Sequence, residues 1–149
     1  MQIIERSAIV PYSAADMYQL VDDIEHYPNF LKWCSASKIL NRNEEEVSAE
    51  LELHFKGVRR SFTTRNRLKK DQSITLELLN GPFKHLEGLW RFNALAEQQC
   101  EISLHLEFEF AHSLTGLLFR PVFIHVADGL VEAFCQRAKE LQLEKDVKI

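Results

Sequence analysis

The chain has 149 residues, of which 46% are hydrophobic and 27% charged, and its net charge is −4. This length and balance exclude a largely disordered chain, and we expect residues 1–149 to form a single domain with a sizeable core. The mild acidity gives no overall reason to expect DNA, RNA or an anionic membrane as a partner, so such contacts would need a local basic patch.

The cysteines and the N-terminus indicate a cytoplasmic location. Cys34, Cys100 and Cys135 are odd in number and form no CxxC pair, as is typical of a reduced compartment. Glu5 and Arg6 stand where a signal peptide needs an apolar core, and no run approaches about eighteen apolar residues. We expect a cytoplasmic protein, for which a transient contact with a membrane surface stays open.

The N-terminal third predicts a strand followed by two helices. Residues 2–10 read as a strand that ends at Pro11, and the S-x-x-D pattern of Ser13 and Asp16 predicts that a helix begins there. A second short helix is expected from near Pro28, because proline suits a first helical turn. The residues that follow, from Cys34 on, become extended. The apolar side chains of this part are Met17, Leu20, Val21, Ile24, Phe30, Leu31 and Trp33.

Residues 46–69 predict an antiparallel hairpin. Apolar and polar residues alternate over 46–55, and the dipeptide Lys56-Gly57 suits a tight turn before the chain runs back. The turn predicts the register of the two strands. The expected pairs are Phe55 with Val58, Leu51 with Phe62, Glu46 with Arg67, and Ser48 with Arg65.

Three further strands are predicted, over 73–79, 84–92 and 100–110, each with an apolar inner face. Asn80-Gly81-Pro82 forms the turn before the second of them, and because no helix follows these residues they are not a phosphate-binding loop. Gly88 inside a strand indicates a bend or the close approach of another group.

The last segment predicts one long helix that covers the sheet. From Leu117 to Leu143 the apolar period becomes helical, and Pro121 should kink this helix or mark its start. Its apolar stripe is Phe119, Phe123, Val126, Leu130, Phe134, Ala138 and Leu141. The order of elements predicts an α+β grip, a curved antiparallel sheet of about seven strands wrapped around the C-terminal helix.

Polar residues at inward positions are the main local signal for a site. Arg60, Thr64 and Asn66 fall in the inward phase, where an unpaired polar group costs about 1–3 kcal/mol. One interpretation is that they line a cavity and bind a polar head group. The other is that Arg60 reaches solvent, while Thr64 and Asn66 bond to the backbone.

A single helix about 10–12 Å across cannot fill the concave face of a long curved sheet, which favours a hydrophobic cavity. The alternative is a filled core, which is the rule for protein interiors. The predicted ligand-binding residues are Leu51, Arg60, Phe62, Thr64, Asn66, Leu76, Trp90, Phe92, Leu106, Phe110, Phe123, Val126, Leu130 and Phe134.

Catalytic and metal sites are not predicted. The chain has six histidines, but none form a helical i, i+4 pair or a His-x-His pair, and the cysteines lack a neighbouring base. His105 and Glu107 are expected to form an ordinary solvated pair on an outer face. Acid–base catalysis by an outward His/Glu pair is the weakest of the functional alternatives.

A basic strip is the one feature that suits RNA. Its members are Arg59, Arg65, Arg67, Lys69 and Lys70, with Glu46, Glu50 and Glu52 beside them. Because these carboxylates offset the charge and no aromatic residue is interleaved to stack bases, a salt-bridged sheet surface is the interpretation favoured by the residues alone.

Four spaced motifs carry a family resemblance: YPNFLKWC (27–34), FKGVRRSFTTRNRL (55–68), GPFKHLEGLWRF (81–92) and LEFEF (106–110). Together they resemble the START-like family of coenzyme Q-binding proteins, which is similar to polyketide cyclases/dehydrases, over nearly the whole chain. The resemblance implies a helix-grip (START/Bet v 1-like) fold that binds ubiquinone or a related isoprenoid lipid in its cavity, in support of respiration, with no other cofactor. Its bacterial branch of ribosome-association toxins implies binding to the large ribosomal subunit and a block of subunit joining.

Two functions from different classes are therefore expected. The leading one is non-enzymatic binding of an isoprenoid quinone or another lipid in the cavity. The alternative is a toxin that associates with the large ribosomal subunit. The sequence gives no reason to expect DNA as a partner.

Overall fold

The computed structural model describes the backbone of residues 1–147 and the side chains of residues 1–142. Residues 148 and 149, which the single-domain prediction includes, lie outside the described residues. The elements in chain order are β1 (Gln2–Val10), α1 (Ala14–Asp22), the 3₁₀ helix η1 (Ile24–Asn29), β2 (Cys34–Arg42), β3 (Glu46–Phe55), β4 (Val58–Lys69), β5 (Ser73–Asn80), β6 (Phe83–Ala96), β7 (Gln99–Phe110) and α2 (Leu114–Val147).

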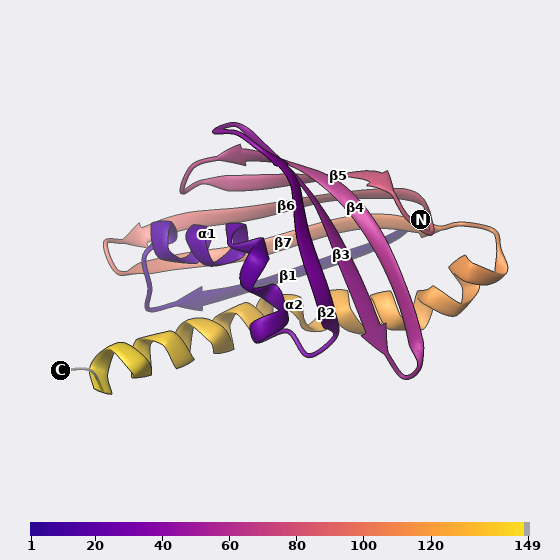
Figure 1. Cartoon of the computed structure of the whole chain (residues 1–149). Coiled ribbons are helices and arrows are strands. Elements are labelled where there is room, and N and C mark those ends of the chain that lie inside the picture. Colours follow the sequence, from indigo (N-terminus) through magenta and orange to yellow (C-terminus); the bar gives the residue numbers. More distant parts are fainter. Residues whose placement is uncertain (148–149) are drawn as a thin grey trace.

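The strands form a single antiparallel sheet with the order β1-β7-β6-β5-β4-β3-β2. Figure 1 shows this sheet curving over α2, with α1 near the C-terminal half of that helix. Helix α2 packs against β1, β7 and β4, and α1 packs against β6 and β7. This architecture confirms the predicted α+β helix-grip fold with its long C-terminal helix.

The β3–β4 hairpin has the predicted turn and register. Lys56 and Gly57 both have positive φ, at 50° and 80°, which is the conformation of a two-residue turn that matches strand twist. As a result Phe55 pairs with Val58 and Leu51 with Phe62. The outer-face partners, Glu46 with Arg67 and Ser48 with Arg65, are also confirmed.

The N-terminal helices show one confirmation and one correction. The Ser13 side chain accepts a hydrogen bond from the Asp16 backbone N–H at 3.0 Å, so the predicted cap of α1 is present. The prediction that the second helix begins near Pro28 is wrong, because η1 begins at Ile24 and contains Pro28 in its last turn. A short 3₁₀ helix has few i→i+3 hydrogen bonds, so a proline near its end interrupts little.

Helix α2 begins at Leu114, one turn before the predicted Leu117. The Ser113 side chain accepts a hydrogen bond from the Gly116 N–H at 3.1 Å and so caps the earlier turn. Pro121 therefore lies inside the helix and does not mark its start. By length and composition Leu114–Gln142 is the one stretch among residues 1–147 that could span a membrane, but its inner face belongs to the core of this fold.

Candidate functional site

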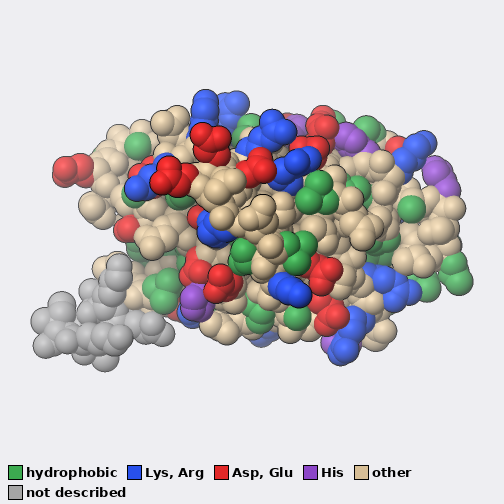
Figure 2. Space-filling view, turned by 45° about the horizontal axis from the view of Figure 1, so that its top comes forward, with side chains coloured by type: hydrophobic (Ala, Val, Ile, Leu, Met, Phe, Trp, Pro, Cys, Tyr) green, Lys and Arg blue, Asp and Glu red, His purple; other side chains and the backbone are tan. Residues whose placement is uncertain are grey.

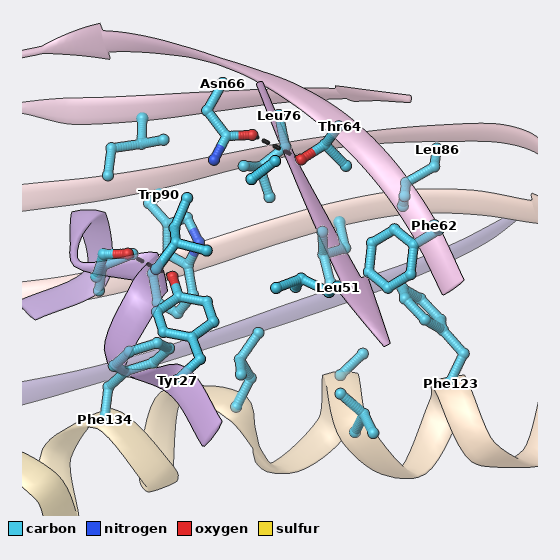
Figure 3. A pocket seen from close by; sticks show the side chains of 18 of the residues that line it. Tyr27, Leu51, Phe62, Thr64, Asn66, Leu76, Leu86, Trp90, Phe123 and Phe134 are labelled. Carbon is cyan, nitrogen blue, oxygen red and sulfur yellow. Dashed lines mark hydrogen bonds between the residues drawn. The ribbon is translucent and has the colours of Figure 1, made fainter. Parts of the chain in front are cut away.

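A cavity of about 80 Å³ lies between the inner face of the sheet and α2. Figure 3 shows residues of β3, β4, β5 and β6 pointing toward α2 and η1 around it. The lining residues are Val21, Ile24, Tyr27, Trp33, Ala49, Leu51, Phe62, Thr64, Asn66, Ile74, Leu76, Leu86, Trp90, Leu106, Phe123, Val126, Ala127, Leu130 and Phe134.

Most of the residues predicted from the sequence are brought together in this lining. They are Leu51, Phe62, Thr64, Asn66, Leu76, Trp90, Leu106, Phe123, Val126, Leu130 and Phe134. Their role in ligand binding stays a prediction, but their convergence on one cavity follows from the inward phase of each strand and of α2. Arg60, Phe92 and Phe110 are not among the lining residues.

Arg60 lies near the β3–β4 turn, beyond the cavity. Its guanidinium Nη1 donates to the carbonyl oxygen of Arg59 at 2.7 Å, in a partly exposed position. The long aliphatic part of an arginine lets the charged group reach solvent even from an inward position. The interpretation in which Arg60 reaches solvent is therefore the correct one for this residue.

Phe92 and Phe110 point inward but lie beyond the two ends of the cavity. Phe92 packs edge-to-face on Tyr18 of α1 at a centroid distance of 5.6 Å. Phe110 stacks on Phe83 at 5.4 Å. Strand phase identifies the face to which a side chain belongs but not its position along the strand. For this reason the sequence predicted both residues as ligand-binding although neither lines the cavity.

Thr64 and Asn66 form the polar part of the lining. The Thr64 hydroxyl donates to the Asn66 side-chain oxygen at 2.8 Å, and Asn66 is only 8% exposed. Figure 3 shows both side chains directed toward the cavity, with the amide nitrogen of Asn66 on the side of Trp90. Among the described residues no hydrogen bond is found for that nitrogen, so it is available to a ligand oxygen.

Tyr27 of η1 adds a second polar group on the opposite wall. Its hydroxyl donates to the carbonyl oxygen of Val21, which satisfies the buried phenol. Burial, and next to it the charge of Asp22, raise the pKa of the Tyr27 hydroxyl well above its usual range. The group therefore stays neutral and acts as a fixed dipole in the cavity wall.

The missing side chain of Gly88 leaves room for Leu76 and Leu106 on the two neighbouring strands. A Cβ at this position would lie 2.6 Å from Leu106 Cδ2 and 3.0 Å from Leu76 Cδ1, and both of these leucines line the cavity. The predicted close approach of another group to Gly88 is confirmed.

Several lining residues were not predicted, namely Val21, Ile24, Tyr27, Trp33, Ala49, Ile74, Leu86 and Ala127. Ala49, Ile74 and Leu86 share the inward phase of their strands, so the alternation could have identified them. Tyr27 and Trp33 come from a 3₁₀ helix and the loop after it, where no regular period relates sequence position to direction.

The cavity coexists with close aromatic contacts. The rings of Trp90 and Phe134 meet edge-to-face at 5.4 Å, so they touch, yet the void remains beside them. Toward the start of α2 the interior is closed by five rings that we call the phenylalanine cluster. Its members, with neighbouring centroids 4.7 to 6.5 Å apart, are Phe62, Phe83, Phe110, Phe119 and Phe123.

The cavity lining contains no Asp, Glu, His, Lys, Arg or Cys within the part of the chain that the structure describes. General acid–base catalysis needs a group that exchanges protons near the working pH. Burial raises the pKa of the Cys34, Cys100 and Cys135 thiols, so these residues are protonated and unreactive at neutral pH. The lining is therefore suited to holding an apolar molecule.

The outer face of the sheet carries paired charges. Arg65 and Arg67 lie 3.5 and 3.9 Å from Glu77 of the neighbouring strand, and Arg59 lies 3.8 Å from Glu52. These pairs agree with the predicted salt-bridged surface, although Arg67 bonds to Glu77 in place of the opposed Glu46.

A group of potential metal ligands that the sequence analysis missed also lies on this outer face. One ligand atom each from His85, Glu87 and Glu107 falls within 4.8 Å of the others. The expected His105–Glu107 pair is present as well, at 3.6 Å. Residues from two strands meet here through the β6–β7 register, which no local spacing reveals. Glu87 is exposed, His85 and Glu107 are half-buried, and none of the three lines the cavity.

Comparison with known proteins agrees with this geometry. The family model described as polyketide cyclase/dehydrase and lipid transport matches residues 10–135. The ribosome association toxin RatA of Escherichia coli K12 is 45% identical over 141 residues, which are 95% of this chain and 89% of that protein. The mitochondrial coenzyme Q-binding protein COQ10 homolog B of Xenopus laevis is 27% identical over 147 residues, 96% of this chain and 60% of that protein. Among solved structures, the Zhui aromatase/cyclase from Streptomyces sp. R1128 has a TM-score of 0.81 at 16% identity, with 93% of each chain covered, a likeness of fold alone.

Proposed function

We propose that this chain, which belongs to the polyketide cyclase/dehydrase and lipid transport family, binds an isoprenoid quinone or a related lipid in the cavity without catalysing a reaction. The observation that carries the proposal is an apolar cavity whose few polar groups, Thr64, Asn66 and Tyr27, are neutral and hydrogen-bonded. An apolar lining with a few placed polar groups is the usual composition of a small-molecule site.

The polar groups suit a carbonyl-bearing head group. The Asn66 amide nitrogen can donate to a quinone oxygen, while Trp90 and Phe134 offer flat apolar surfaces to the ring. A hydrogen bond of this kind contributes about 0.5–1.5 kcal/mol. Asn66→Leu should therefore weaken quinone binding by roughly three- to tenfold, while binding of a hydrocarbon without oxygen atoms should not weaken.

Ligand entry requires movement of the walls. A cavity of about 80 Å³ is well below the roughly 300–1,000 Å³ of typical ligand sites. Five lining residues are partly exposed, namely Trp33, Leu51, Thr64, Leu76 and Leu130. Three of them, Trp33, Leu51 and Leu130, belong to the loop after η1, to β3 and to α2. We infer that the entrance lies between these three segments and that the cavity widens there when a ligand enters.

The test is extraction of the purified protein with organic solvent, followed by mass spectrometry, together with quinone uptake from detergent micelles. Leu130→Trp should abolish both, because the larger ring occupies the cavity. Leu95→Trp is the matched control, since Leu95 is exposed on β6 and does not line the cavity. Absence of lipid in the wild-type protein, with no uptake, would overturn the proposal, and so would equal uptake by the two variants.

A second function is favoured by one observation, the similarity of this chain to the E. coli ribosome association toxin RatA, which is 45% identical to it. We propose association with the large ribosomal subunit as the alternative, with the exposed Lys69 and Lys70 near the end of β4 as contacts to phosphates. Co-sedimentation with isolated large subunits at increasing salt tests it, because a phosphate-dominated contact weakens steeply with ionic strength. No retention at low salt would exclude this function. The cytoplasmic location on which it depends stays a prediction.

A further inference from the structure

The first half of α2 is apolar on its outer face as well as on its inner face. Between Glu109 and Asp128 the sequence contains no acidic residue and a single Lys or Arg, Arg120, together with the histidines His112 and His125. Only 39% of the most apolar 18-residue window of this helix is buried. The uncovered side carries Thr115, Arg120 and His125 as well as apolar residues, and where apolar residues gather on it they form a surface that water does not favour.

The exposed part consists of three leucines at the start of the helix. Leu114, Leu117 and Leu118 are 72%, 65% and 46% exposed. Leu114 and Leu117 border a surface groove together with Met1, which is itself 70% exposed. Single exposed leucines are common, but three leucines at helix positions i, i+3 and i+4 lie on one side of the helix and form a continuous apolar patch.

Basic side chains flank this patch on two sides. Arg120 borders the same groove as Leu114 and Leu117, with Glu109 as the one acidic residue there. On the other side lies the β3–β4 turn, since Phe55 stacks on His125 of α2 at 4.5 Å. Leu118 precedes His125 by seven residues, so it lies on the same helix face about two turns, or roughly 10 Å, closer to the start of α2.

The β3–β4 turn carries Lys56, Arg59 and Arg60 in sequence positions next to Phe55, and Glu52, 3.8 Å from Arg59, is the acidic partner found for them among residues 1–142. In Figure 2 hydrophobic side chains and Lys and Arg side chains are both visible at the right-hand end of the molecule, where Figure 1 places the start of α2. Acidic side chains are also visible at this end in Figure 2. The basic residues named here, Lys56, Arg59, Arg60 and Arg120, outnumber the two acidic residues found beside them, Glu52 and Glu109.

We propose that this end, consisting of Leu114, Leu117 and Leu118 with Lys56, Arg60 and Arg120 around them, is a docking surface for a bilayer with anionic lipid head groups. The leucines insert at the level of the head groups, and the basic side chains bind the lipid phosphates. Apolar residues rimmed by lysine and arginine are the composition by which a helix lies on an anionic membrane.

The docking surface lies next to the phenylalanine cluster, because Phe119 is the inward neighbour of Leu118 on the same helix. Docking therefore places the filled end of the fold at the membrane in which a lipid ligand is dissolved, with the phenylalanine cluster between the membrane and the cavity. This relation rests on the proposed lipid-binding function, whereas the docking surface itself does not.

The test is flotation of the full chain with vesicles of phosphatidylcholine alone and of equimolar phosphatidylcholine and phosphatidylglycerol. The wild-type protein should float with the anionic vesicles and less with the neutral ones, and rising salt should reduce binding. Leu117→Glu should reduce binding to anionic vesicles at least tenfold. Leu95→Glu is the control, since Leu95 is 48% exposed at the opposite end of β6 and should bind as the wild type does. Circular dichroism of both variants verifies that they are folded.

Equal flotation of Leu117→Glu and Leu95→Glu would overturn the proposal. It would also be overturned if the protein did not float but Leu117→Glu abolished self-association in sedimentation experiments, since the patch would then contact a second copy. A Leu117-dependent association with large ribosomal subunits, without flotation, would overturn it in favour of the ribosome. Extraction of lipid from the same samples separates the two proposals: a protein that floats but never carries lipid keeps the docking surface and loses the lipid-binding function.

Discussion

The two ends of the space between the sheet and α2 have the same apolar pattern but are filled differently. Toward the start of α2 the phenylalanine cluster fills the interior, and Phe83 and Phe123 lie 4.7 Å apart. Toward η1 the inward positions include Ala49, Thr64, Gly88 and Ala127, and a cavity remains. The small side chains at these four positions leave space open there, although Tyr27, Trp90 and Phe134 also line it.

The largest effect is expected from breaking the filled end. Phe119 is fully buried and packs on the four other members of the phenylalanine cluster. Phe119→Ala should lower the free energy of unfolding by about 3–5 kcal/mol, because the rings around it cannot close the new space. Urea denaturation measures this, with the exposed neighbour Leu117→Ala as a control that should change stability by less than about 0.5 kcal/mol. A loss at Phe119 below about 1 kcal/mol would show that the cluster is loosely packed.

Two glycines offer a direct comparison of the ends. A Cβ on Gly81 would lie 2.6 Å from Phe62 Cβ and 3.3 Å from its Cα, which cannot move without the strand. Gly81→Ala should cost about 1–3 kcal/mol. A Cβ on Gly88 would lie closest to the ends of the Leu106 and Leu76 side chains, which border the cavity and can turn into it, and it would lie 3.4 Å from Leu76 Cβ, an ordinary contact distance. Thermal denaturation should rank Gly81→Ala as the less stable variant, and the reverse order would mean that the cavity end is as rigid as the filled end.

Two alanines of α2 test the cavity by addition of volume. Ala127 lines the cavity, whereas Ala138 is buried elsewhere on the helix. Ala138→Leu should destabilise the protein by about 1–3 kcal/mol, since a packed site has no room for a larger side chain. The loss of stability for Ala127→Leu should be smaller by about 1 kcal/mol, because the added carbons enter existing space. Chemical denaturation of both variants measures the difference, and equal losses would argue against a void beside Ala127.

The smallest effect concerns the ionisation of one buried thiol, that of Cys34. Burial raises the pKa of the Cys34 thiol from its usual 9.0 to about 11. A folded-state pKa above the unfolded value means that this stabilising contribution is complete below pH 9 and is lost as the pH rises through about 11. Part of the alkaline loss of stability should therefore disappear in Cys34→Ala, as measured by denaturation at pH 8 and pH 10.5. The prediction fails if the wild type and the variant lose the same amount of stability over this range.

The sequence by itself determined most of the elements and the register of the β3–β4 hairpin. The S-x-x-D cap, the Lys56-Gly57 turn and the period-two alternation depend on interactions within a few residues, so α1 and the β3–β4 hairpin were predicted correctly. The family resemblance carried by the four motifs is confirmed by the family match and by the relatives. The start of α2 at Leu114, after the Ser113 cap, and the extent of η1 were missed, because weak caps and 3₁₀ turns leave little periodic signal.

Only the tertiary structure decided which inward residues meet. Strand phase placed Thr64, Asn66 and Trp90 on the inner face, but it placed Arg60, Phe92 and Phe110 there as well. Two features that strand phase does not give separate the cavity from the filled core. One is the position of each residue along the curved sheet, and the other is the direction of Tyr27 and Trp33, which come from irregular backbone. A local pattern fixes the direction of a side chain, whereas the volume left between distant segments depends on how all of them pack together.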